Sequence, residues 1–182
     1  MVKIADFHVE QWMEKYEKTD GVLNIAETCA SSISIDELSK LSTEKSVAPL
    51  DSSVRLTYGA VRGSSRLRES LVRHHGGPQV RPDQVIVTQG AISANFILFY
   101  ALVGPGDHVV CVYPTYQQLF SVPQSLGCEV SAWELKPEHG YIPQVSELEG
   151  LVKPNTKVCV AIPSGAKSYE LKMIDAGYQQ SQ

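Results

Sequence analysis

The sequence predicts an α/β protein: a partial three-layer α/β/α sheet, mostly parallel, preceded by a helical N-terminal arm. From residue 64 onward, short continuous apolar runs alternate with helix-like segments, a pattern typical of parallel strands covered on both faces. Before residue 54 the chain is more polar and has no comparable alternation. We therefore expect three parts: residues 1–53 as the arm, residues 54–162 as the sheet domain, and residues 163–182 as a divergent tail.

Within the arm, two short helices are expected. Phe7 to Lys18 is amphipathic, with aromatic residues set among charged ones. Ser34 followed by Glu37 is typical of an N-cap, which would open a second helix running through Leu41. Residues 43–53 are polar, contain a proline, and should form a loop.

The regular part begins with a helix that Ser64 can cap and that ends near His75, before Gly76-Gly77-Pro78. A short strand is expected at Val85–Thr88, and a helix from Ala91 to Val103, where apolar residues recur at helical spacing. After a turn at residues 104–107, the pattern predicts in order a strand at 108–112, a helix at 115–125, a strand at 129–133, a helix at 146–152 and a strand at 157–162.

Composition excludes several classes of function. The 182 residues are 43% apolar and 20% charged with a net charge of −4, and no basic block suggests nucleic acid as a partner. The N-terminus lacks the apolar stretch of a secretory signal, and the longest apolar run, residues 96–103, is too short to span a membrane. We expect a cytoplasmic protein.

Cysteine and histidine spacing gives no metal site. The four cysteines lie far apart without a CxxC motif, and Cys111 and Cys159 fall in apolar runs where a small buried thiol is expected. His74, His75, His108 and His139 show no ligand spacing, so we expect them at the surface or at helix ends.

Gln89, Gly90 and Ala91 follow the first predicted strand and open a helix. In parallel sheets, ligands bind beyond the carboxyl ends of the strands, and a helix N-terminus offers free N–H groups to a phosphate. Taken alone, the segment is better explained as a tight strand-to-helix turn than as a phosphate site.

Two tyrosines could complete a site for a phosphorylated aromatic cofactor. Tyr116 follows the second strand, where its ring could lie against a flat cofactor ring, or simply cover the sheet edge. Tyr58 precedes a glycine-containing segment, and its hydroxyl could donate to a phosphate, or it could be an ordinary surface or core tyrosine.

Together, the order and spacing of these motifs resemble the N-terminal half of class I/II aminotransferases, the fold-type-I enzymes that use pyridoxal 5′-phosphate. In that resemblance, Tyr58 with Gly59, Gly63, Leu67 and Arg68 matches the segment whose tyrosine reaches the cofactor phosphate of the neighbouring subunit. Gln89, Gly90 and Ala91 match the phosphate turn, and Tyr116, after Pro114, matches the ring that stacks on the pyridine. The resemblance implies a large-domain fold at 54–162, a small-domain contribution from the arm, a homodimer, and amino acid and 2-oxo acid substrates.

The match ends near Ile162, where the chain departs from the family's Asn-Pro-x-x-Pro-Thr-Gly loop. The family's Schiff-base lysine has no counterpart in the sequence, so no catalytic residue is assigned; Lys167 lies in a Ser/Gly-rich segment and is expected to be solvated. We therefore expect a truncated chain that is inactive alone. Two alternatives remain open: a related pyridoxal-phosphate lyase, cyclase or racemase, and a non-catalytic module that binds a ligand or a paralogue.

Overall fold

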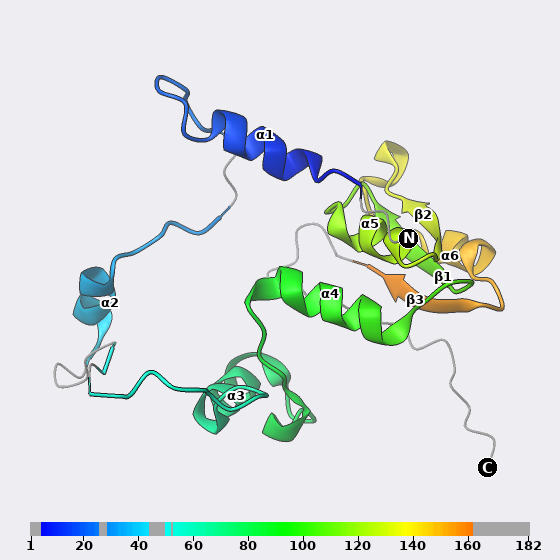
Figure 1. The fold of residues 1–182 in the computed structure, drawn as a ribbon. Helices are drawn as coiled ribbons and strands as arrows, with labels where there is room; N and C mark the ends of the chain where they lie inside the picture. Colours follow the sequence, from blue (N-terminus) through cyan, green and yellow to red (C-terminus); the bar gives the residue numbers. More distant parts are fainter. Residues whose placement is uncertain (1–4, 26–28, 44–49, 52, 162–182) are drawn as a thin grey trace, which may run out of the picture. The chain divides into compact units, whose positions relative to one another are not determined.

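The computed structural model describes residues 5–25, 29–43, 50–51 and 53–161 (Figure 1). The chain forms two compact units, one made of residues 1–12 with 87–182 and the other of residues 13–86. Helix α1 (His8–Tyr16) crosses the boundary between them. The predicted tail, residues 163–182, lies outside the described residues, and Lys167 with it.

The first unit contains a parallel sheet of three strands in the order β2-β1-β3. Strand β1 (His108–Tyr113) lies in the centre and pairs with β2 (Glu129–Glu134) on one side and β3 (Thr156–Val160) on the other. Helix α5 (Gln118–Ser125) connects β1 to β2, and α6 (Val145–Leu151) connects β2 to β3 after a short 3-10 turn at Pro137–His139. These are the parallel βαβ units that the alternating pattern predicts.

Side chains alternate between the two faces of the sheet, and each face has its own core. One face packs against α4 (Gly90–Leu102) and α5; its buried residues are Phe99, Val103, Val109, Cys111, Leu119, Val122, Cys128, Val158 and Val160. The other face packs against α6; its buried residues are Val110, Val112, Trp133, Leu148 and Cys159. The three-layer α/β/α prediction is thus confirmed, as is the burial of Cys111 and Cys159.

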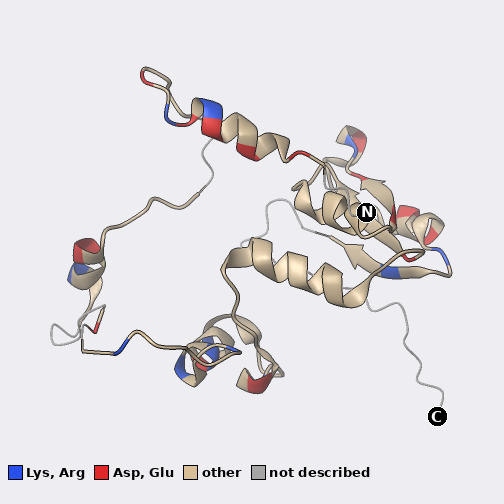
Figure 2. Cartoon of the chain, in the orientation of Figure 1, with Lys and Arg blue, Asp and Glu red and all other residues tan. Residues whose placement is uncertain are grey.

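Helix α4 is uncharged and mostly apolar, although it includes Ser93 and Asn95. It carries no Lys, Arg, Asp or Glu and is tan along its length in Figure 2. Phe99 is buried against the sheet, whereas Ile92, Phe96, Ile97 and Tyr100 are exposed in this chain.

The second unit is held by local interactions. It contains α2 (Ile35–Leu41), α3 (Ser65–Leu71), a π-helical turn at Val72–Gly76 and a 3-10 turn at Pro82–Gln84. Ser34 and Glu37 form the predicted capping box on α2, and the Ser64 side chain accepts from Leu67 N–H at the start of α3. Arg68 donates to the carbonyls of Gly63 (3.1 Å) and Pro82 (2.6 Å), which ties α3 to the 3-10 turn. The predicted helix through His75 is therefore α-helical only to Leu71 and π-helical beyond it.

The prediction of a strand at Val85–Thr88 is wrong. These residues have no regular secondary structure and pair with none of the three described strands. An apolar run becomes a strand only when a neighbour supplies the ladder hydrogen bonds. β1 is paired on both sides, and neither β2 nor β3, the edge strands of the described sheet, pairs with this segment.

The expectation that His108 lies at the surface is also wrong. Its side chain is fully buried at the start of β1, between Thr156 Oγ1 (2.7 Å from Nδ1) and Ser131 Oγ (2.9 Å from Nε2). A neutral imidazole has one donor and one acceptor nitrogen, and a hydroxyl on each neighbouring strand satisfies both. Burial is the main cause that lowers the His108 pKa, and the positive charge of Lys153 adds to it.

The described residues contain neither a membrane-spanning helix nor a metal-binding cluster. Within those ranges, no helix is long and apolar enough to cross a membrane. No cluster of three or more His, Cys, Asp or Glu side chains there could hold a metal ion.

Candidate functional site

The turn into α4 requires glycine at position 90. Gly90 has φ +75°, in the left-handed region that side-chain-bearing residues avoid. Gly90 N–H donates to the Thr88 carbonyl (3.0 Å), and the Thr88 hydroxyl donates to the Gly90 carbonyl (3.1 Å). These bonds close the turn tightly before the helix begins.

The N-terminus of α4 has no side-chain cap from its N-cap residue, Gln89. The first N–H groups of a helix lack intrahelical partners, and here they belong to small or apolar residues, Ala91 and Ile92. Together with the partial positive charge of the helix end, this arrangement suits an anion such as a phosphate.

A buried glutamine fixes this helix end relative to the start of α5. Gln118 is 4% exposed; its amide N–H donates to the Ile92 carbonyl (2.6 Å), and its oxygen accepts from the Asn95 amide (3.2 Å). Gln118 therefore connects the first turns of α4 with the segment that carries Tyr116.

Tyr116 lies two residues before Gln118 and is 39% exposed. Its ring packs edge-on with Phe7, at 5.2 Å between ring centroids and 72° between planes. Its hydroxyl donates a long hydrogen bond (3.4 Å) to a Glu10 carboxylate oxygen. Burial, and then the negative charge of Glu10, raise the pKa of the Tyr116 phenol, which keeps it protonated.

The structure brings four of the five predicted site residues into one unit. Gln89, Gly90 and Ala91 form the start of α4, and Tyr116 lies beside the start of α5, tied to α4 through Gln118. Tyr58 belongs to the other unit, where its side chain is fully exposed. Sequence reasoning missed Phe7, Glu10 and Gln118, because the contacts they make span 23 to 109 residues and leave no local signal.

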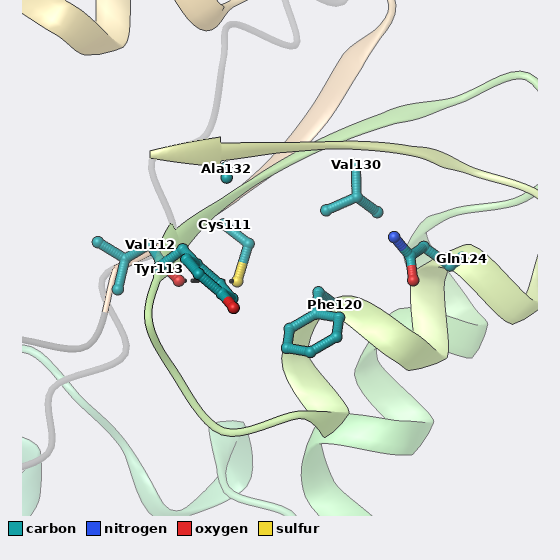
Figure 3. A pocket seen from close by; sticks show the side chains of 7 residues that line it. All are labelled: Cys111, Val112, Tyr113, Phe120, Gln124, Val130 and Ala132. Atoms are coloured by element: carbon teal, nitrogen blue, oxygen red, sulfur yellow. Dashed lines mark hydrogen bonds between the residues drawn. The ribbon is translucent and has the colours of Figure 1, made fainter. Parts of the chain in front are cut away.

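A pocket of about 160 Å³ lies beside this region, between α5 and the strands β1 and β2 (Figure 3). It is lined by Cys111, Val112, Tyr113, Phe120, Gln124, Val130 and Ala132, and so contains none of the predicted site residues. Cofactor pockets usually measure roughly 300–1,000 Å³, so this one is too small to mark such a site. Burial raises the pKa of the Cys111 thiol to about 12, which leaves it an unreactive packing group.

Residues 35–164 match the family model described as aminotransferase class I and II. The chain belongs to this family. Its enzymes are pyridoxal-phosphate dependent, and the fold-type-I expectation is confirmed.

The aminotransferase relatives include bacterial enzymes of known structure. The chain is 33% identical over 106 residues to the aspartate/prephenate aminotransferase of Thermus thermophilus, a match that covers 57% of this chain and 28% of the relative. It is 36% identical to a PLP-dependent aminotransferase from Streptococcus suis, with a TM-score of 0.76 over 86% of this chain and 42% of that one. The matched part of the chain thus covers less than a third of the length of the first curated relative.

One relative carries a different kind of name. The chain is 33% identical over 115 residues to the capreomycidine synthase of Streptomyces vinaceus. This match covers 59% of this chain and 28% of that protein. The match to this synthase thus covers a similar share of the chain as the match to the aminotransferase.

Proposed function

We propose that this chain contributes the phosphate and ring subsites of a pyridoxal-phosphate-dependent aminotransferase, which transfers an amino group between an amino acid and a 2-oxo acid. The observation that carries the proposal is the uncapped N-terminus of α4, opened by Gly90 and tied through Gln118 to the segment that carries Tyr116. The names of the aminotransferase relatives support the reaction and its substrate class.

The residues present fit the cofactor in two respects. The backbone N–H groups after Gly90 would donate hydrogen bonds to the phosphate, since small residues allow close approach and Gln89 makes no side-chain cap at the helix end. The half-exposed ring of Tyr116 offers a flat surface for the pyridine. When bound, the cofactor supplies the electron sink for bonds at the amino acid Cα; these residues bind and orient it.

Tyr58 would act across a dimer. We propose that the functional form is a homodimer and that the exposed Tyr58 hydroxyl donates to the phosphate held by the partner subunit. We also propose that residues 54–162 form the cofactor-binding half of a large domain, with residues 1–53 as arm and small-domain segment.

The first test is a calorimetric titration with pyridoxine 5′-phosphate, whose alcohol replaces the aldehyde and so cannot react with surface lysines. We expect micromolar to millimolar affinity, about −8 to −4 kcal/mol. Gly90→Asp places a carboxylate at the proposed phosphate subsite and should weaken the binding of pyridoxine 5′-phosphate at least tenfold. Gly150→Asp adds the same charge on α6, over the opposite face of the sheet, and should leave binding unchanged.

A titration with inorganic phosphate distinguishes the phosphate subsite from the ring subsite. Tyr116→Ala should weaken pyridoxine 5′-phosphate and leave inorganic phosphate unaffected, since only the former has a ring to stack. Binding that Gly90→Asp does not weaken would place the ligand elsewhere and contradict the proposal.

A second candidate is a related pyridoxal-phosphate reaction, because the match to a synthase covers a similar share of this chain. The holoenzyme, or this chain with whatever partner completes it, decides between the two. Amino-acid-dependent conversion of a 2-oxo acid into its amino acid supports the aminotransferase, whereas product formation without a 2-oxo acid supports the alternative. Binding without turnover in either assay would favour a non-catalytic module.

A further inference from the structure

The N-terminal segment, residues 5–10, lies on the part of the chain that carries Tyr116, although more than 100 residues separate them. Four interactions connect the two segments, and all involve Tyr116 or Gln117. The dark-blue start of the chain reaches the N-terminal end of α5 in Figure 1. We call residues 5–10 the strap.

Gln117 holds the strap on both sides of Phe7. Its amide oxygen accepts from His8 N–H (3.2 Å), and its amide N–H donates to the Asp6 carbonyl (2.6 Å). His8 is the first residue of α1, so its N–H has no intrahelical acceptor, and Gln117 supplies one. A side-chain amide that pairs with the backbone in this two-point manner fixes both the position and the direction of the segment.

The strap then holds Tyr116 at two points. Phe7 packs against the ring, within the 4.5–7 Å centroid range that aromatic pairs prefer, and Glu10 accepts from the hydroxyl. A ring contacted on its side and at its tip has little freedom to rotate. The raised pKa of Tyr116, caused by burial and then by Glu10, is consistent with this enclosure.

We propose that the strap, held in place by the hydrogen bonds of Gln117, sets the plane of the Tyr116 ring and so prepares it to stack on a flat ligand. Gln117 is a positioning residue, Phe7 and Glu10 are further members of the candidate site, and the ring's role in binding rests on the proposed function. Preorganisation of this kind increases affinity, because the ring is ordered before the ligand arrives.

The experiment uses the full chain and compares Gln117→Ala and Phe7→Ala with the control Gln11→Ala, an exposed glutamine on α1. Without ligand, Tyr116 is nitrated with tetranitromethane and the nitrated peptides are quantified by mass spectrometry. Tyr141, which is 54% exposed, serves as the internal standard. We expect Gln117→Ala and Phe7→Ala to raise nitration of Tyr116 relative to Tyr141 about 3- to 10-fold, and Gln11→Ala to leave it unchanged.

The same proteins are then titrated with pyridoxine 5′-phosphate and with inorganic phosphate. Both strap variants should weaken pyridoxine 5′-phosphate about 3- to 10-fold and leave inorganic phosphate unaffected, because the strap touches the ring and not the helix end. A general loss of structure would weaken the binding of both ligands and lower the temperature of thermal unfolding. Weaker binding of pyridoxine 5′-phosphate alone therefore distinguishes a loss of ring positioning from a loss of structure.

Three outcomes would overturn the proposal: unchanged nitration of Tyr116 in both variants, equal weakening of the two ligands, or tighter binding of pyridoxine 5′-phosphate. The last would mean that the strap obstructs the ring. Should even the unaltered protein bind neither ligand, the proposed function fails, while the nitration result still decides whether the strap orders Tyr116.

Discussion

Residues 87–161 and residues 13–86 differ in how they are stabilised. Every buried residue in the described part of the chain lies between Phe99 and Val160, and most of these residues form the two cores on either face of the sheet. Among the described residues of 13–86, none is buried, and order there comes from caps, turns and the carbonyl contacts of Arg68. The difference teaches that the candidate phosphate and ring subsites rest on a scaffold with its own core, whereas Tyr58 does not.

The largest expected effect is a core truncation in the sheet unit. Leu119 lies on α5, is 1% exposed and packs in the core, so Leu119→Ala should lower the free energy of unfolding by about 2–5 kcal/mol. Leu41→Ala, at a position 71% exposed on α2, should change it by less than about 0.5 kcal/mol. Urea unfolding followed by tryptophan fluorescence, which reports the buried Trp133, measures both; equal effects would remove the contrast between the two regions.

Strain at the phosphate turn should give the next largest effect. A Cβ at Gly90 would meet open space, so the cost of Gly90→Ala comes from φ alone, about 1–2 kcal/mol. Gly104→Ala also meets open space, but its φ lies outside the left-handed region, so it is the matched control. If the two variants share one melting temperature, the turn at Gly90 does not have the conformation described.

Acid should destabilise the sheet unit through His108. Its pKa is lowered in the folded state, so the unfolded chain binds the proton more readily, and the stabilisation present above about pH 6.5 is lost as the pH falls below that value. One histidine can contribute a slope of at most about 1.4 kcal/mol per pH unit. Urea unfolding at pH 7.5 and pH 5.5 measures it, and His108→Gln should flatten the slope in this window; an equally steep slope in that variant would assign the acid sensitivity to other groups.

The smallest effect on global unfolding is expected from the N-cap of α2, in residues 13–86. Ser34→Ala removes the capping box and should cost about 1 kcal/mol of helix stability in α2, with little change in the unfolding of the sheet core. Hydrogen exchange of the α2 amides should accelerate while that of β1 stays the same. Parallel acceleration in both would show that the two regions unfold together.

The sequence predicted those features that local patterns encode. Apolar runs alternating with helices gave the βαβ order, Ser34 with Glu37 gave the cap on α2, and Gly90 marked the turn into α4. Sequence-based prediction failed where residues far apart in the chain determine the local structure or burial. Val85–Thr88 has the composition of a strand but no described neighbour, and His108 is buried because Ser131 and Thr156, 23 and 48 residues away, meet its ring. Likewise, nothing near Tyr116 in the sequence indicates that Phe7 and Glu10 contact it.

The central claim is that the start of α4 and the ring of Tyr116 form one ligand site on the sheet unit. A titration of the ¹⁵N-labelled chain with pyridoxine 5′-phosphate, followed by backbone amide resonances, tests it most directly. We expect the largest shifts at Gly90, Ala91 and Ile92, with a second group around Tyr116, and with inorganic phosphate we expect the first group alone. Shifts confined to residues 13–86 or to the opposite end of the sheet near His108, or no shifts at millimolar ligand, would contradict the account.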